Sequence, residues 1–369
     1  MHVKTFKPLY PNLLGIEDFD ALISNIKEDF SIPSLLPFIN QTEHPGFILY
    51  SIASNEQNGT GIICLTAIQD YINGMVLTHE NTLEEKETRQ YNLIKKRGAV
   101  IKPVLLTYPD HEWFDEYLDS LKSDSNKLFD YFFEDRSQKH TFWMISKQDD
   151  VNKIQTFFER DLLRVYIADG HHRFSTFAKY SNKQRSGIPP WILSVYFPFT
   201  ALRIYAFNRI FQPDISFDQS HLIEKVKDYC FVEKTDHAIK PQFKYNFLIM
   251  NKKKVWSCVW KPSVLEKYKA DELMLDVTLL NQIIFTQILG VTDIRTDARI
   301  QYIEGLKGWE GMTREIAKDK NYIGFYLYPI SMEDFQIVAD RDMVLPPKST
   351  WFEPRIRNGL IIHEFSKDV

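Results

Sequence analysis

The chain has 369 residues, of which 44% are hydrophobic, 14% aromatic and 25% charged, and its formal net charge at pH 7 is -4. This composition is typical of a globular protein with a proper core, and the negative balance argues against nucleic acid as a partner, because duplex binding needs a dense basic face. The sequence contains no CxxC pair, secretory signal or apolar run of roughly 20 residues, so we expect no zinc ribbon, no membrane span and a cytoplasmic location.

The first half of the chain is predicted to mix helices and strands. Helical spacing of apolar residues occurs at 15–30, and strands at 46–54 and 59–71 flank an Asn/Gly turn, as in a hairpin. A helix at 81–98 is acidic early and basic late, with Gly98 as its predicted C-cap. The elements that follow are a strand (99–110), a helix and polar loop (111–140), a strand (140–148), a helix (149–161) and a strand (164–170) that leads directly into a helix.

The second half contains two strands within 191–211, broken near Pro198, and then shorter amphipathic segments. Helices are predicted at 216–229, 278–290 and 331–340, and strands at 245–250, 254–261 and 321–329. Strands and helices mix without strict βαβ alternation, which predicts the α+β class with a mixed sheet. A boundary near residue 213 divides a region 1–213 from a smaller α+β region 214–369, whose closing strand is expected to pack back on the first region.

The stretch "VYIADGHHRF" concentrates polar groups where a strand leads into a helix. Gly170 allows backbone N–H groups to approach a ligand, and the first turn of the following helix offers unpaired donors to an anion. Arg173 suits phosphate oxygens, while His171 and His172 supply donors or carry a proton. Asp169 would hold a metal ion or accept a proton. The alternative is that Asp169 caps the helix and the histidines are ordinary core or surface residues.

A second stretch, "GMVLTHENTLEEKETRQ", places His79 and Glu80 at another junction between a strand and a helix. Glu80 is a candidate general base for a hydroxyl group, or a second carboxylate beside a metal. Asn81 and Thr82 are candidate cap residues for the helix that follows. The alternative is that Glu80 is simply a charge stabilised at a helix N-terminus.

A third stretch, "VLPPKSTWFEPRIRNGLI", presents Lys348, Ser349 and Thr350 after two prolines. The prolines stiffen an extended backbone that could deliver the lysine to an anion, although the glycines of a Walker motif are absent. The alternative is a structural turn before the closing strand. The sequence has no HExxH, GxSxG or GxGxxG motif, so zinc proteases, serine hydrolases of that type and standard dinucleotide binders lose their usual support.

With "GMVLTHENTL", "VYIADGHHRF" and "LPPKSTWFEPRIRNGLII" in this order, the chain resembles the family of domain of unknown function 1015, from about residue 45 to the end. The helical stretch "MLDVTLLNQIIFTQILGV" resembles a late helix of that family. Two departures stand out: "FKPLYPNLLG" does not reproduce the family's N-terminal "PPYDV" type of segment, and Phe174 and Ser175 replace its usual glutamate and tyrosine. Roles of those two positions in the family cannot be carried over.

The turn "DGHHR" also resembles the D-G-x-H-R motif of the ParB/sulfiredoxin-like superfamily, which includes free-serine kinases. That resemblance implies a nucleotide-binding region in 1–213, with ATP or ADP and Mg²⁺ as cofactors and Asp169 beside the metal. The implied catalytic residues are Asp169, His172 and Glu80. The implied phosphate- or nucleotide-binding residues are Gly170, His171 and Arg173. The other two stretches add His79, Thr82, Lys348, Ser349 and Thr350 as candidates for the same role.

The resulting expectation is a nucleotide-dependent phosphotransferase whose partners are a nucleotide and a small hydroxyl-bearing metabolite such as free serine. Two other classes stay open. One is a nucleotide-binding regulatory module with little turnover. The other is a metal-dependent hydrolase in which histidines ligate the metal, although adjacent histidines at a helix start point in different directions.

Overall fold

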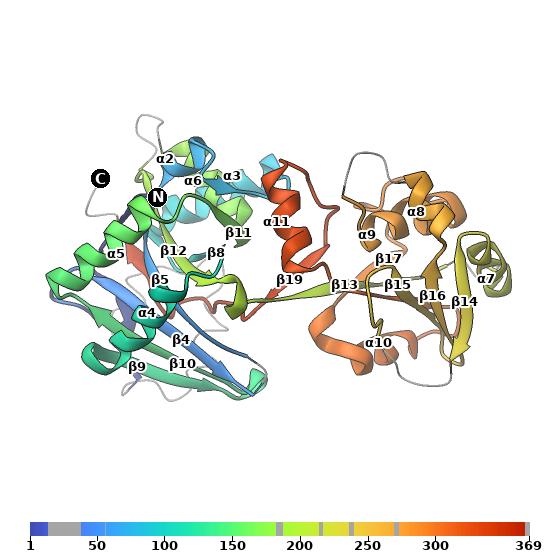
Figure 1. Ribbon diagram of the computed structural model, residues 1–369, viewed down its shortest axis with the longest axis horizontal. Coiled ribbons are helices and arrows are strands. Elements are labelled where there is room, and N and C mark those ends of the chain that lie inside the picture. Colours follow the sequence, from blue (N-terminus) through green and yellow to red (C-terminus); the bar gives the residue numbers. More distant parts are fainter. Residues whose placement is uncertain are drawn as a thin grey trace. The chain divides into compact units, whose positions relative to one another are not determined.

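The computed structural model describes residues 1–13, 38–55, 57–181, 187–213, 217–235, 240–268 and 273–365 (Figure 1). The helix predicted at 15–30 lies outside the described residues. Within them, no helix is long and apolar enough to cross a bilayer. Helices and strands are mixed, and the larger sheet has parallel and antiparallel pairs, so the predicted α+β class is confirmed.

The chain divides into two compact units, Met1–Arg203 with Pro354–Val369, and Ile204–Glu353. The sequence placed the boundary near residue 213 instead. The difference arises because the strand β13 (Arg203–Phe211) pairs with strands of the second unit at its C-terminal half, from Phe207 onward.

The first unit is built on a mixed sheet with the strand order β6-β11-β8-β12-β5-β4-β10-β9, and β1 pairs with β5. Its strands are β1 (Val3–Lys4), β4 (Phe47–Ser54), β5 (Asn58–Ala67), β6 (Val76–Leu77), β8 (Val104–Tyr108), β9 (Asn126–Phe133), β10 (Gln138–Ile145), β11 (Val165–Asp169) and β12 (Trp191–Pro198). The antiparallel pair β4 and β5 confirms the predicted hairpin, although its second strand ends at Ala67. Two small sheets, β2 (Leu9–Pro11) with β3 (Ile39–Gln41) and β7 (Ala99–Val100) with β20 (His363–Glu364), complete this unit.

The helices of the first unit are α2 (Ile68–Ile72), α3 (Glu84–Arg97), α4 (Glu112–Asp124), α5 (Gln148–Arg160) and α6 (His171–Tyr180), with short 3-10 turns at Glu134–Arg136 and Phe199–Ala201. Helices α2 and α3 pack against α6 beside β11 (Figure 1). Gly98 ends α3 in the left-handed conformation at φ 61°, which confirms the predicted C-cap. The predicted loop after α4 is wrong, because β9 occupies Asn126–Phe133 and pairs with β10.

Strand direction brings three segments to one edge of this sheet. β11 runs parallel to β6 and antiparallel to β8. The residues that follow β6 and β11 therefore lie on the same side as those that precede β8. This edge holds the loop 78–83, the turn 169–171 and the segment around Lys102.

The second unit has a sheet of order β14-β16-β15-β18-β13-β17, with β19 paired to β13. Its other strands are β14 (Cys230–Thr235), β15 (Asn246–Met250), β16 (Val255–Trp260), β17 (Ile300–Glu304), β18 (Ile323–Leu327) and β19 (Thr350–Glu353). Its helices are α7 (Gln219–Lys227), α8 (Pro262–Tyr268), α9 (Asp276–Leu279), the π-helix η5 (Leu280–Ile288), a 3-10 turn (Gly305–Lys307), α10 (Gly308–Ile316) and α11 (Met332–Asp340). The helix predicted at 278–290 is thus found as α9 and η5, whereas β14, β17, α8 and α10 were not predicted.

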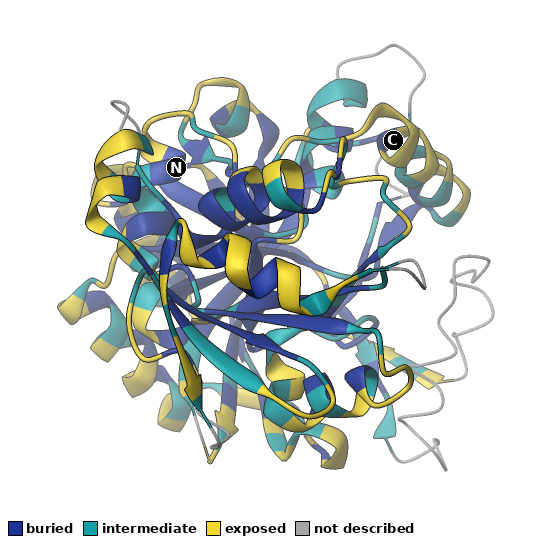
Figure 2. Cartoon of the chain, turned by 90° about the vertical axis from the view of Figure 1, so that its right-hand side faces the viewer, coloured by how far each residue is buried: buried dark blue, intermediate teal, exposed yellow. Residues whose placement is uncertain are grey.

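The buried residues lie mainly in the strands of the two large sheets. The strands are largely buried, while the helices present exposed outer faces (Figure 2). The core of the second unit gathers side chains of α7, η5 and the strands, among them Val226, Phe247, Ile284 and Phe325. The Arg209 side chain is also fully buried in this unit, at 0% exposure.

Candidate functional site

The turn between β11 and α6 depends on a glycine. Gly170 lies between the end of β11 and the first residue of α6, with φ 110° and ψ 25°, a conformation that disfavours side chains. A Cβ atom at this position would lie 2.7 Å from Arg173 Nη2, because the arginine folds back over the turn. Gly170 itself is the N-cap residue of α6, and no side chain caps the helix. The alternative role of Asp169 as a helix cap is therefore wrong.

The Asp169 carboxylate lies among three cations. Lys102 Nζ and Arg173 Nη2 approach Asp169 Oδ2 at 3.0 Å and 2.9 Å, and Arg355 Nη2 lies 3.9 Å from Oδ1. Arg173 Nη1 also donates to the carbonyl oxygens of Lys102 and Pro103, at 2.8 Å and 2.9 Å. The cluster keeps a positive surplus beside the first turn of α6, where a helix already favours anions.

These cations determine the protonation state of Asp169. Burial alone would raise the pKa of this carboxyl, but Lys102, Arg173 and Arg355 hold the pKa well below its ordinary value. Asp169 is therefore ionised at neutral pH. A carboxylate with so low a pKa is a poor proton acceptor, because general bases work best with a pKa near the operating pH.

The donor set around Asp169 is a poor match for the predicted Mg²⁺. Oδ2 of Asp169 is already engaged by an ammonium and a guanidinium group. Among the described residues, no group of three His, Cys, Asp or Glu side chains is placed to hold a metal ion. Mg²⁺ needs oxygen ligands that are free of competing cations. The residues at Asp169 therefore do not fit a metal ion.

Two of the predicted residues form a buried histidine pair. The rings of His79, after β6, and His171, at the start of α6, lie 4.4 Å apart at an angle of 86°. A hydrogen bond with the Ile167 backbone helps to hold His79. Both side chains are buried, so the loop after β6 and the turn after β11 are packed together.

Burial keeps both histidines neutral at pH 7. It is the main cause that lowers the pKa of His171 to about 4, and it lowers the pKa of His79 well below the ordinary value. His171 Nε2 is buried and has no hydrogen-bond partner among the described residues. A buried polar atom without a partner is costly unless a ligand or water satisfies it.

Glu80 lies beside this pair. Its Oε2 atom is 3.9 Å from His171 Nδ1, and 35% of its side chain is exposed. Glu80 is therefore a carboxylate that can reach both solvent and the turn. Its predicted role as a general base stays a prediction.

His172 follows His171 at the start of α6 and is partly buried. Burial lowers its pKa, Lys86 lowers it further, and Glu87 opposes the shift. His172 Nδ1 is another buried atom without a hydrogen-bond partner among the described residues. Its predicted catalytic role stays a prediction.

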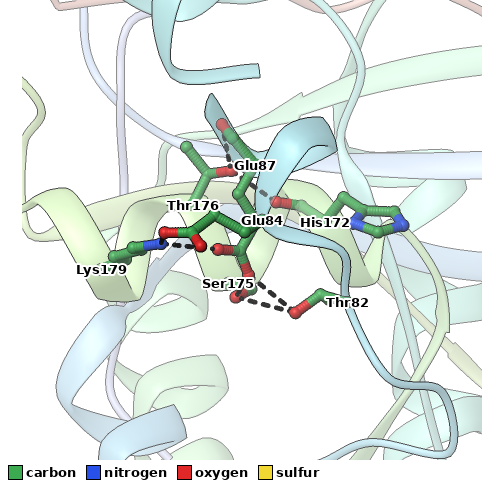
Figure 3. Close-up of polar contacts among 7 residues, drawn as sticks. All are labelled: Thr82, Glu84, Glu87, His172, Ser175, Thr176 and Lys179. Carbon is green, nitrogen blue, oxygen red and sulfur yellow. Dashed lines mark hydrogen bonds and ion pairs between the residues drawn. The ribbon is translucent and has the colours of Figure 1, made fainter. Parts of the chain in front are cut away.

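Thr82 does not act as the predicted cap. The N-cap residue of α3 is Leu83, and no side chain bonds there. Thr82 Oγ1 instead donates to Glu87 Oε1 at 2.7 Å, and Ser175 Oγ donates to the same oxygen (Figure 3). Ser175, one of the two departures from the family pattern, thus contacts a glutamate of α3. Phe174, at the other departure, is fully buried.

The remaining predicted residues, Lys348, Ser349 and Thr350, belong to the other compact unit. Lys348 has a positive φ of 57°, and its carbonyl oxygen accepts from Arg209 Nη2 at 3.3 Å. Ser349 Oγ donates to the Pro346 carbonyl oxygen at 2.5 Å. Their role in phosphate binding stays a prediction.

Sequence reasoning missed two cations of the Asp169 cluster, Lys102 and Arg355. Lys102 precedes β8, whose register places Leu105 opposite Asp169, and Arg355 follows the "PPKST" stretch. The sequence pointed to Arg355 only through its position in the third stretch, "VLPPKSTWFEPRIRNGLI". Lys102 carried no signal of its own, because its contact depends on strand pairing.

Comparisons with known proteins give a family match. A family model described as "Protein of unknown function (DUF1015)" matches residues 37–278, a range that leaves out the "PPKST" stretch. No curated protein matches the chain.

Solved structures with some similarity include three proteins. A free serine kinase in complex with AMP is 15% identical, with coverage of 79% of this chain and 86% of that one and a TM-score of 0.40. SbnI with a C-terminal truncation, from Staphylococcus aureus, is 9% identical, with coverage of 80% and 85% and a TM-score of 0.44. A conserved hypothetical protein from Pyrococcus furiosus is 15% identical, with coverage of 83% and 96% and a TM-score of 0.40. At TM-scores this low we draw no function from them.

Proposed function

The chain belongs to the family described as "Protein of unknown function (DUF1015)", and we propose that it is a nucleotide-dependent phosphotransferase that acts on a small hydroxyl-bearing metabolite such as free serine. The observation that carries this proposal is the cation-rich turn at the start of α6 with Glu80 beside it. ATP or ADP is the proposed phosphoryl donor.

The turn supports binding of a phosphate group. Lys102 and Arg173, both in direct contact with Asp169, bring one more positive charge than is needed to balance its carboxylate, and Arg355 lies near the same carboxylate. The first backbone N–H groups of α6 have no partner inside the helix, and its dipole adds positive potential there. Gly170 has no side chain, and the guanidinium group of Arg173 occupies the space where a Cβ atom would lie. In this proposal Asp169 orients the cations and does not accept the proton.

Glu80 is the proposed general base. The substrate oxygen attacks the terminal phosphorus atom, the bond from that phosphorus to the bridging oxygen breaks, and the shortened nucleotide leaves. The hydroxyl proton passes to the Glu80 carboxylate. The surplus cations stabilise the charge that develops on the transferred group. No step runs through a metal at Asp169, because the donor set there does not fit one.

Transfer to a panel of hydroxy amino acids tests the proposal. The purified chain is incubated with Mg²⁺ and ATP or ADP, and the phosphorylated product is measured by mass spectrometry. Glu80→Gln should lower kcat about 100-fold, since general-base catalysis contributes on this scale, with the nucleotide KM nearly unchanged. Lys102→Met should raise the nucleotide KM about 10-fold, because it removes charge from the binding site.

Asp130→Asn is the matched control, because Asp130 also pairs with two lysines but lies away from the turn, on β9. Equal turnover of wild type and Glu80→Gln would contradict the proposed base. Tight nucleotide binding without any transfer would replace the proposal with a regulatory nucleotide-binding module. Tightly held zinc, iron or manganese would favour the hydrolase.

A further inference from the structure

A buried glutamate joins the two segments that form the candidate site. Glu87 lies in the first turns of α3 and is 7% exposed. Its carboxylate accepts from Thr82 Oγ1 at 2.7 Å, from Ser175 Oγ, and from Lys179 Nζ at 3.2 Å (Figure 3). Charge-assisted hydrogen bonds are stronger than neutral ones, so three of them hold this side chain firmly in place.

The partners of Glu87 come from two different segments of the candidate site. Thr82 lies two residues after Glu80, in the loop between β6 and α3. Ser175 and Lys179 lie on α6, whose first turn contains His171. The carboxylate of Glu87 thus bonds at once to the segment with the proposed base and to the helix with the proposed phosphate site.

A second contact fixes the same helices through the backbone. Thr176 Oγ1 lies 3.3 Å from the Glu87 carbonyl oxygen and 2.6 Å from the His172 carbonyl oxygen. This hydroxyl group therefore links α3 to the first turn of α6. Figure 3 shows Thr176 beside Glu87, with the His172 ring directed away from the carboxylate.

Electrostatics favours the ionised form of Glu87. Burial alone would raise the pKa of its carboxyl, but hydrogen bonds from Ser175, Thr82 and Lys179 outweigh burial and lower the pKa below its ordinary value. The site therefore holds a carboxylate that accepts from every partner. Lys179 has a second partner in Glu84, at 3.0 Å, but that side chain is exposed.

We propose that Glu87 is a positioning residue that sets the place of Glu80 relative to the first turn of α6. This inference rests on the proposed function. Glu87 does not touch the substrate and acts through Thr82 on the loop and through Ser175 on the helix. Its loss should therefore affect the geometry of proton transfer more than nucleotide binding.

Four variants separate this role from general stability. Glu87→Ala removes all of the contacts, and Glu87→Gln keeps an oxygen that accepts from Thr82 and Ser175. Thr82→Val removes only the contact to the loop, and it keeps the proposal testable if Glu87→Ala does not fold. Glu84→Gln is the matched control, because it changes an exposed glutamate of the same helix that shares Lys179.

Steady-state kinetics give the first readout. Glu87→Ala should lower kcat up to about 100-fold, since displacements of about an ångström cost this much, and Thr82→Val about 10-fold. The nucleotide KM should stay within about 2-fold in Thr82→Val. Glu87→Gln should recover most of kcat, and Glu84→Gln should match wild type. Wild-type kcat in Thr82→Val, or an equal loss in Glu87→Gln and Glu87→Ala, would overturn the proposal.

Hydrogen exchange separates failure of this inference from failure of the proposed function. If wild type transfers no phosphate, the phosphotransferase proposal fails, and exchange of the 78–83 amides still tests the coupling. Faster exchange there in Thr82→Val than in Glu84→Gln supports the positioning role, because exchange reports local opening. Identical exchange in the two variants overturns it.

Discussion

The two units hold their buried charges in opposite ways. In the first unit, Asp169 is surrounded by cations, with Lys102 and Arg173 in direct contact. In the second unit, the guanidinium group of Arg209 is fully buried without a carboxylate partner among the described residues. Arg209 donates to the carbonyl oxygens of Phe207 and Lys348 and lies 5.5 Å from the Tyr302 ring.

The pKa shifts of buried titratable groups also differ in direction between the units. Burial lowers the pKa of His171 in the first unit to about 4. Burial raises the pKa of Asp276 in the second unit to about 7, although Tyr245 N donates to its Oδ2 atom at 3.0 Å. The same physical cause, loss of water, thus favours the neutral form of both groups. The comparison teaches that burial is the main cause that sets the state of Asp276, whereas nearby cations set the state of Asp169.

The largest expected effect is the response of Asp276 to pH. Because its folded pKa is raised, its contribution to stability is present below about pH 4 and is lost as pH rises through about 7. By linkage the loss amounts to about 4 kcal/mol. Asp276→Asn should remove this loss, so that the variant is more stable than wild type at pH 8. Urea unfolding followed by tryptophan fluorescence at pH 5 and pH 8 measures it.

Asp334 gives a comparison for this prediction, because it is a buried carboxyl of the same unit that pairs with Lys244 at 2.8 Å, and its charge also raises the pKa of Asp276. Asp334→Asn removes a paired charge and should not stabilise the protein at pH 8. If Asp276→Asn keeps the wild-type slope between pH 5 and pH 8, then Asp276 is not held neutral by burial.

The next effect is expected in the Asp169 cluster. Asp169→Asn leaves Lys102 and Arg173 facing each other without a counter-charge, which should lower the free energy of unfolding by about 3 kcal/mol. Asp130→Asn, whose two lysine partners are half exposed, should lower it by less than about 1 kcal/mol. Urea unfolding at pH 7 compares them. Equal losses would show that the charges of the turn contribute no more than a surface ion pair.

Protonation of His171 at low pH is expected to lower the free energy of unfolding by a similar amount. Its folded pKa is lowered, so its contribution is present above about pH 6.5 and is lost as pH falls toward 4, by about 3 kcal/mol in full. This slope opposes that of Asp276 over the same range, so it is best seen in the Asp276→Asn background. His171→Gln should flatten it there. An NMR titration of His171 with a midpoint near 6.5 would contradict the prediction.

The smallest effect is expected for Arg209. Arg209→Met removes a buried cation that has no ion pair among the described residues and replaces it with an apolar chain of similar length. Such replacements are often nearly neutral, so the free energy of unfolding should change by no more than about 1 kcal/mol. Arg173→Met, which strips Asp169 of a direct partner, is the contrasting variant and should cost more. A larger loss in Arg209→Met than in Arg173→Met would reverse the comparison between the units.

Local sequence patterns predicted the elements whose signals lie within one segment. The charge gradient and Gly98 of α3 and the turn between β4 and β5 are examples. β9 was taken for a loop because only Phe129 and Phe133 of this edge strand are buried, which leaves no clear alternation. The strands and helices missed in the second unit are likewise short, and much of their form depends on neighbouring strands.

The candidate site was predictable only in part for the same reason. The turn at 169–171 was visible because a strand, a glycine and a helix follow one another in the chain. The contacts of Lys102 and Glu87 arise between segments that are far apart in sequence. Neither contact has a local pattern, so only the fold could place them.

The return of residues 354–369 to the first unit has a consequence for biosynthesis. Arg355, which faces Asp169, and β20, which pairs with β7, are both made after the entire second unit. A nascent chain that has emerged only as far as Arg203 therefore lacks one cation of the turn and one strand. The segment with Arg355 and β20 must emerge from the ribosome before the cluster around Asp169 can be complete, so the order of synthesis delays the maturation of this turn.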